Sequence, residues 1–97
     1  MRPSELVREK AEEIRALTAR YPTLVHPRVF GSAARGDDRP DSDIDILVDA
    51  LPGTTLFDIG GLMEELKELL GVKVDVMTPG DFPPVIRERV LKDARPL

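Results

Sequence analysis

The segment Asp43–Asp49, in which acidic and apolar residues alternate from Asp43 to Ile46, is the feature that most constrains the fold. Side chains of a β-strand point alternately to its two faces, so Asp43 and Asp45 share one face while Ile44 and Ile46 share the other. Such a strand needs a sheet that buries the apolar face and leaves the acidic face open. Two neighbouring carboxylates repel each other unless a cation lies between them, so this segment predicts a site for a hard divalent metal ion.

A second segment, Val72–Met77, repeats the alternation, with its valines predicted to face inward and Asp75 outward. If the two strands are neighbours, Asp75 lies close to Asp43 and Asp45. Three carboxylates on one sheet face can bind two Mg²⁺ ions about 3.5–4 Å apart, an arrangement that supports in-line displacement at phosphorus. One ion would polarise an acceptor hydroxyl and the other would hold a triphosphate. Asp75 could serve as a metal ligand or also accept the hydroxyl proton.

The remaining pattern predicts three helices and one further strand. We expect helices over residues 4–20, Phe57–Leu70 and Val85–Ala94, strands over Leu24–Phe30, Asp43–Asp49 and Val72–Met77, and one helical turn over Gly31–Arg35. Ser4 is the predicted N-cap of the first helix, and Phe57 is expected to face the core. The pair Gly60-Gly61 indicates either a close approach of another group or a helix that starts after Phe57. The predicted fold is α+β, a single domain (1–97) with a small mixed sheet covered by helices on one face.

Composition and charge argue against several classes of protein. The 97 residues suffice for one small core, and 33% of them are charged. The net charge of −4 argues against direct binding to a nucleic-acid backbone, which needs a basic surface. No apolar run approaches the roughly 18–20 residues of a membrane span, and the charged first 20 residues do not resemble a signal peptide. We therefore expect a cytoplasmic protein.

Gly31 and Ser32 predict a phosphate contact beside the acidic residues. Glycine allows a phosphate to approach the backbone closely, and the short helix that follows presents free N–H groups. Ser42 either caps its loop or contacts the triphosphate, and Arg35 either reaches a phosphate or pairs with Asp37-Asp38. The sequence leaves both alternatives open.

Two other ligand-binding motifs fail at defined positions. The acidic run from Asp41 matches the first, third and fifth positions of a calcium-binding loop, but Ile46 and Pro52 stand where that loop needs glycine and glutamate. The spacing of Gly31 and Gly36 matches the start of a Walker A loop. Two aspartates follow, however, where that loop needs lysine and a hydroxyl residue.

Gly31, Ser32, Asp43 and Asp45 resemble the signature of the minimal nucleotidyltransferase (MNT) family of the DNA polymerase β-like superfamily, which is Gly-Ser, ten residues, then Asp-x-Asp. The family's third carboxylate corresponds to Asp75, and the resemblance covers nearly the whole chain. It implies a nucleotidyltransferase-like fold and an adenylyltransferase that depends on ATP and Mg²⁺. In that enzyme the three aspartates would bind metal, and Gly31 and Ser32 would contact phosphates.

Small prokaryotic members of this family resemble the antitoxin half of HEPN/MNT pairs. The resemblance therefore implies a type VII-like antitoxin that adds AMP to a tyrosine hydroxyl of a HEPN ribonuclease toxin, with which it would form a hetero-oligomer. The strands and helices use nearly all residues, so the acceptor must bring its own binding surface, which favours a folded protein. Two alternatives stay open: an antitoxin that occludes its toxin without catalysis, and a nucleotidyltransferase that acts on nucleic acid ends or small molecules.

Overall fold

The predicted sheet is present in the computed structural model, which describes residues 1–97. Its strands lie in the order β3-β2-β1-β4, with the bounds β1 Leu24–Phe30, β2 Ile44–Ala50, β3 Val74–Met77 and β4 Arg95–Pro96. β2 pairs antiparallel with β1 and parallel with β3, and β4 pairs antiparallel with β1. The sheet is therefore mixed, as predicted. The sequence does not predict β4, because a strand of two residues has no detectable alternation.

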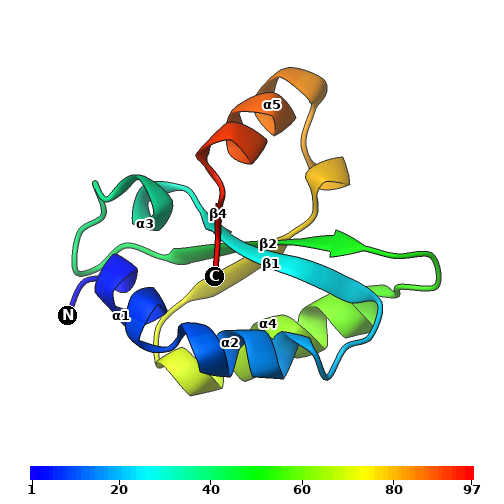
Figure 1. Cartoon of the computed structure of the whole chain (residues 1–97), viewed down its shortest axis with the longest axis horizontal. Coiled ribbons are helices and arrows are strands. Elements are labelled where there is room, and N and C mark those ends of the chain that lie inside the picture. The colour runs from blue at the N-terminus through cyan, green and yellow to red at the C-terminus, as the bar shows by residue number, and fades with distance from the viewer.

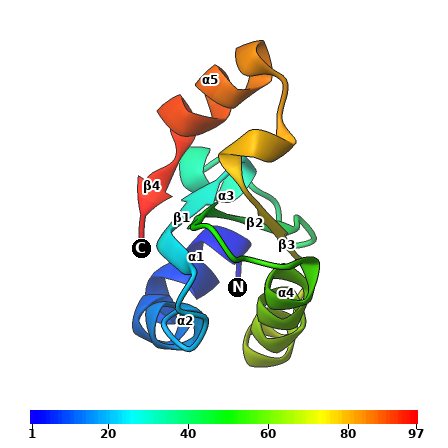
Figure 2. The same cartoon turned by 90° about the vertical axis from the view of Figure 1, so that its right-hand side faces the viewer.

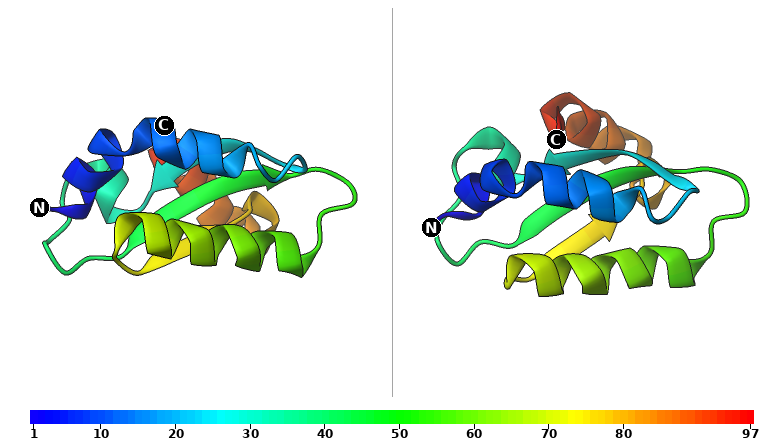
Figure 3. Two further views of the ribbon diagram at one scale, coloured as in Figure 1. Left: turned by 90° about the horizontal axis from the view of Figure 1, so that it is seen from below. Right: turned by 60° about the horizontal axis from the view of Figure 1, so that its bottom comes forward.

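Three helices cover one face of the sheet in Figures 1 and 3: α1 (Pro3–Glu9), α2 (Ala11–Thr18) and α4 (Leu56–Leu70). The remaining helical elements are the single turn α3 (Ser32–Arg35), the 3-10 helix η1 (Pro79–Asp81) and α5 (Pro84–Asp93). In the side view of Figure 2, α5 stands on the opposite side of the sheet from α2 and α4. The α+β fold class is confirmed, and α5 is the exception to the prediction that helices cover one face only.

The core lies between the sheet and the three covering helices. β2 contributes Ile44, Ile46 and Val48, all fully buried. The other members of the buried cluster are Val7, Ile14, Leu24, Val29, Ala33, Leu62, Leu66, Leu70, Val74 and Val76. Full burial of one large aliphatic side chain contributes roughly 1.5–3 kcal/mol. A slip of β2 by one residue would expose its whole apolar set, so the core fixes which face carries the aspartates.

The opposite face of β2 is partly covered. Leu47 lies on that face and is fully buried, while η1 packs against β2. Phe82, which follows η1, meets Phe30 edge-to-face with ring centroids 5.9 Å apart. The buried Leu47 therefore separates the two acidic residues on this face of β2. Asp45 lies at the end where β2 begins, and Asp49 lies at the far end.

Asp49 forms a separate polar cluster with the irregular start of β1. The pairing register shifts between Val25 and Arg28, where His26 has a φ of 55° beside Pro27. This agrees with the irregular pairing that a proline imposes on a strand. His26 Nδ1 and Arg28 Nη2 each lie 2.8 Å from a carboxylate oxygen of Asp49. Burial alone would raise the pKa of Asp49, but these two partners outweigh it and lower the pKa.

The predicted single helix over residues 4–20 is wrong, because α1 and α2 are separated at Lys10, which has φ −102° and ψ 13°. Val7 and Ile14 are seven residues apart, about two helical turns, so the apolar spacing does not reveal the break. The prediction that Ser4 is the N-cap is also wrong. The cap position is Arg2, and the Ser4 N–H donates instead to Asp38 Oδ2 at 2.8 Å.

The prediction that Phe57 faces the core is wrong as well, since its side chain is 89% exposed. α4 begins at Leu56, where Thr55 and Asp58 exchange hydrogen bonds across the first turn. Phe57 precedes the buried Leu62 by five residues and so points about 140° away from it around the helix. The first turn of α4 extends beyond the core.

The predicted closing helix is present as α5, but it buries no residue. Val85, Ile86 and Leu91 are all exposed. No helix of this protein has the length and hydropathy that crossing a bilayer requires; the longest, α4, has 15 residues.

Gly60 and Gly61 of α4 offer a matched test of helix packing. An alanine Cβ at position 60 would meet no atom within 4 Å, so Gly60→Ala should raise the free energy of unfolding by about 0.5–1 kcal/mol. A Cβ at position 61 would lie 3.0 Å from Tyr21 Oη, which donates a 2.6 Å hydrogen bond to Glu65. The Tyr21 ring must shift to make room, so Gly61→Ala should not stabilise the protein as Gly60→Ala does. Urea denaturation measures both variants, and equal stabilisation would contradict the close approach of Tyr21.

Candidate active site

The parallel pairing of β2 with β3 brings two of the predicted site residues together. Asp45 and Asp75 are register partners, and side chains at paired positions of parallel strands point to the same face. Asp43 lies on the same face, two residues before Asp45. The Ile44 N–H donates to the Lys73 carbonyl at 3.0 Å, which forms the first rung between the strands. The prediction that these two strands are neighbours in the sheet is therefore confirmed.

The three carboxylates act on one another electrostatically. The pKa of Asp45 is raised to about 6, first by burial, then by the negative charge of Asp75 and then by that of Asp43. Arg35 and Lys73 oppose this rise through their positive charge. Lys73 Nζ lies 3.6 Å from Asp43 Oδ2, although its side chain is largely exposed. Additional positive charge at this end of the sheet would therefore stabilise the ionised carboxylates.

These residues fit a divalent metal ion by their chemistry. Carboxylate oxygens are the ligands that Mg²⁺ prefers. Burial raises the pKa of Asp45 most, and the neighbouring charges of Asp75 and Asp43, which a cation would neutralise, raise it further. The side chains do not converge on a single point, because no group of three His, Cys, Asp or Glu residues lies close enough to hold one ion as they stand. Asp43, Asp45 and Asp75 would hold the metal after their side chains turn toward it.

Gly31 lies directly against the Asp45 carboxylate. It has a φ of 71°, and a Cβ built at this position would overlap the carboxylate. Both facts require glycine here. α3 begins at the next residue, Ser32, so the N–H groups of Ser32 and Ala33 have no carbonyl partner within the helix. The structure thus places the predicted phosphate-contacting segment beside Asp45.

The loop between α3 and β2 is held by its own hydrogen bonds. Ser42 Oγ accepts a hydrogen bond from the Arg39 N–H at 2.9 Å, which is the capping alternative left open by the sequence. A contact between Ser42 and nucleotide stays a prediction. Asp38 is 5% exposed and caps α1 through Ser4. Burial would raise the pKa of Asp38, but hydrogen bonding, above all from the Ser4 N–H, outweighs this effect and lowers the pKa.

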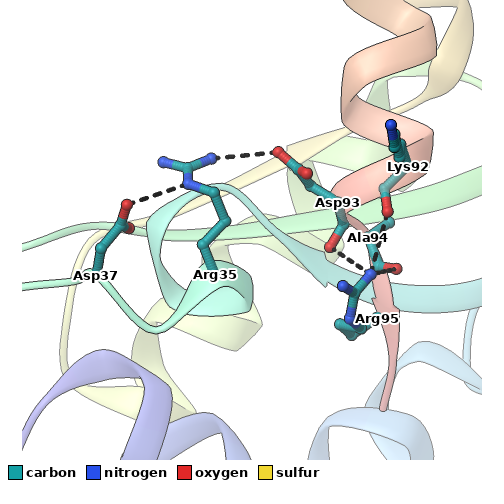
Figure 4. A network of polar contacts seen from close by, with 6 residues as sticks. All are labelled: Arg35, Asp37, Lys92, Asp93, Ala94 and Arg95. Atoms are coloured by element: carbon teal, nitrogen blue, oxygen red, sulfur yellow. Dashed lines mark hydrogen bonds and ion pairs between the residues drawn. The ribbon is translucent and has the colours of Figure 1, made fainter.

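Arg35 connects the site to α5, as Figure 4 shows. Its Nε donates to Asp37 Oδ2 at 3.3 Å and its Nη1 to Asp93 Oδ2 at 3.5 Å. The sequence offered Asp37 as one partner, but nothing in it indicated Asp93, which is 58 residues away. Arg95 lies next to this pair and donates to three carbonyls at the end of α5.

The site is an open surface rather than an enclosed pocket. A pocket of about 300 Å³ lies elsewhere, between α1, α3 and the C-terminal residues, where Val7, Ala33 and Leu97 are among its lining. None of the three aspartates lines it. The aspartates therefore lie outside this pocket, on a partly exposed region of the surface.

Comparison with known proteins gives consistent findings. The nucleotidyltransferase domain family matches residues 8–97. The chain is 44% identical over 66 residues to a Methanocaldococcus jannaschii protein that is provisionally named a protein adenylyltransferase, and the match covers 68% of this chain and 71% of that protein. It is 40% identical over 65 residues to the protein adenylyltransferase MntA of Thermococcus cleftensis, covering 67% of this chain and 66% of that protein.

Two solved structures have the same fold. One, provisionally described as a minimal nucleotidyltransferase, has a TM-score of 0.86 and 45% identity and covers 97% of this chain and 95% of its own. The other is a toxin–antitoxin with AMP-PNP. Its matching chain has a TM-score of 0.75 and 26% identity, and the match covers 88% of this chain and 69% of that chain.

Asp45→Asn should change how stability depends on pH. With a folded pKa near 6, above its ordinary value of 3.8, Asp45 destabilises the metal-free fold when ionised. This cost is full above about pH 7 and is relieved as the pH falls through 6 toward 4. Asp45→Asn should therefore raise the free energy of unfolding at pH 8 by on the order of 1 kcal/mol, and the gain should disappear near pH 4.

Urea denaturation without metal at several pH values measures this difference. The exposed Asp41, for which no hydrogen bond or ion pair is found, gives the control variant Asp41→Asn. A gain for Asp45→Asn that does not vary with pH would contradict the electrostatic coupling of the carboxylates.

Gly31→Ala and Gly53→Ala form a second matched pair. Both glycines have positive φ, so alanine should cost roughly 1–2 kcal/mol of backbone strain at each position. At Gly53 the new Cβ meets open space, whereas at Gly31 it meets the Asp45 carboxylate. Gly31→Ala should therefore be clearly more destabilising in chemical denaturation. Equal losses for both variants would show that Asp45 does not lie against Gly31.

Proposed function

Because this chain belongs to the nucleotidyltransferase domain family, we propose that it transfers AMP from ATP to a hydroxyl group of a partner protein. The observation that carries the proposal is the register of Asp45 with Asp75, next to Gly31 and Ser32. An acidic pair beside a backbone that can approach phosphate is the minimum that metal-dependent nucleotidyl transfer requires. The relatives named protein adenylyltransferases support AMP as the transferred group and a protein as the acceptor.

The candidate residues divide into metal ligands and nucleotide contacts, and Asp75 has a second role as proton acceptor. Asp43, Asp45 and Asp75 would hold two Mg²⁺ ions, which would supply positive charge to polarise the acceptor oxygen and to neutralise the leaving pyrophosphate. Gly31 and Ser32 would contact the phosphates through the backbone and the hydroxyl, and Ser42 would contact the nucleotide from the adjoining loop.

The reaction balances without a further reagent. The acceptor oxygen would attack the α-phosphorus of ATP while the bond from that phosphorus to pyrophosphate breaks. The acceptor's proton would pass to the Asp75 carboxylate, and pyrophosphate would leave. The transferred AMP then remains on the partner as a phosphodiester.

A folded acceptor suits the open surface of the site. No pocket encloses the aspartates, so a small acceptor would find few contacts, whereas a protein can bring its own surface. The toxin–antitoxin with AMP-PNP supports a toxin as that partner. We infer a tyrosine of a cognate HEPN-type ribonuclease as the acceptor, a hetero-oligomer with it, a type VII-like antitoxin role and a cytoplasmic location. Direct binding to nucleic acid is not expected.

The alternative with most support is an antitoxin that neutralises its partner by occlusion. The toxin–antitoxin relationship is compatible with it, because binding alone can block a toxin. The two proposals differ in whether the acidic residues are needed. A transferase that acts on nucleic acid ends or small molecules is the remaining alternative, and the acidic net charge argues against nucleic acid.

Asp43→Asn separates the transferase from the occluding antitoxin. The purified cognate partner is incubated with ATP, Mg²⁺ and either the wild type or the variant, and its intact mass is measured. We expect increments of AMP with the wild type and a loss of at least about a hundredfold in rate with Asp43→Asn, as for removal of a catalytic metal ligand. Asp41→Asn, the same change at an exposed position nearby, should retain the rate. Neutralisation of the partner by Asp43→Asn without any mass increment would contradict the proposal and favour occlusion.

A further inference from the structure

α5 is attached to the rest of the protein at few points. It buries no residue, and Arg87 donates only to the carbonyls of Pro79 and Phe82, within the segment that leads into the helix. The bond between Arg35 and Asp93 is the only hydrogen bond from an α5 side chain to a more distant part of the chain. Figure 4 shows that it joins the end of α5 to Arg35, the last residue of α3.

The bond between Arg35 and Asp93 is weak, so another anion can replace Asp93. The atoms Nη1 and Oδ2 are 3.5 Å apart, and the two side chains are 48% and 39% exposed. Exposed ion pairs with such geometry contribute little net free energy, because water solvates both charges well. A stronger anion in reach of Arg35 would therefore displace Asp93.

Arg35 lies where such an anion would bind. It follows Ser32 by three residues in α3, and its charge acts on the Asp45 carboxylate. A guanidinium binds phosphate best through two parallel N–H bonds, and these bonds are shorter and stronger than an exposed pair with a carboxylate. Asp37 occupies Nε and Asp93 occupies Nη1, so in the free protein Arg35 cannot offer both of its terminal nitrogens fully to a phosphate.

We propose that Asp93 competes with the bound nucleotide for Arg35, so that nucleotide binding breaks the Arg35–Asp93 bond and loosens the C-terminal end of α5. The inference rests on the proposed function, since it assumes that a triphosphate occupies the segment at Gly31 and Ser32. Linkage makes the effect reciprocal: if nucleotide disfavours the bond, the bond must weaken nucleotide binding by the same factor. Asp93 thus modulates the affinity of the site from a helix that supplies none of the proposed metal ligands.

The test is nucleotide affinity in the variant Asp93→Asn, measured by calorimetry with AMP-PNP and Mg²⁺. Loss of the competing charge should tighten binding, by up to about fivefold if the exposed pair has an ordinary strength. The control is Glu88→Gln, which removes the same charge from an exposed position of α5 without removing a bond, and it should bind as the wild type does. A damaged fold would weaken nucleotide binding, so tighter binding by Asp93→Asn would report the loss of the competing charge.

Hydrogen exchange gives an independent measure of the bond. In the wild type, AMP-PNP with Mg²⁺ should speed exchange at the amides of residues 90–94, whereas in Asp93→Asn these amides should exchange fast already and respond little. Unchanged or weaker nucleotide binding by Asp93→Asn would overturn the proposal, as would slower exchange in this part of α5 when nucleotide binds. A wild type that transfers AMP while Asp93→Asn binds nucleotide unchanged would refute this inference alone. A wild type that binds no AMP-PNP would refute the proposed function with it.

Discussion

The parallel pairing of β2 with β3 is the constraint on which the site depends. Burial of Ile44 and Ile46 on one strand and of Val74 on the other fixes both the faces and the register. Because the period of a strand is two, that register places Asp45 beside Asp75 on the side away from the core. The hydrophobic effect, acting on buried aliphatic residues, thus brings together the two aspartates that we propose as metal ligands.

The same arrangement concentrates negative charge at one end of the sheet, and the structure offsets it in several ways. Lys73 lies near Asp43, Arg35 acts on Asp45, and glycine at position 31 leaves room for the Asp45 carboxylate. The pKa of Asp45 is still raised, first by burial and then by repulsion from Asp75 and Asp43. If the proposed Mg²⁺ binds here, neutralising this repulsion would contribute to its affinity.

Much of the fold could be predicted from the sequence, because the alternating strands and the Gly-Ser and Asp-x-Asp segments are local patterns. The family, the α+β class and the pairing of the acidic strands are confirmed. The break at Lys10 could not be seen, since it leaves the apolar spacing intact, and the exposure of Phe57 depends on where the core ends rather than on periodicity. The hydrogen bonds Ser4–Asp38 and Arg35–Asp93 could not be predicted either, because each joins segments that are far apart in the sequence.

Titration of the Asp45 carboxyl group, followed by carbon NMR in the wild type and in Asp75→Asn, tests the coupling of the carboxylates most directly. We expect a pKa near 6 in the metal-free wild type, a lower pKa in Asp75→Asn because one negative neighbour is lost, and a lower pKa on addition of Mg²⁺. If Asp45 titrates near 4 in both proteins and its pKa does not change when Mg²⁺ is added, the three aspartates do not form the common metal site on which the proposed transfer of AMP depends.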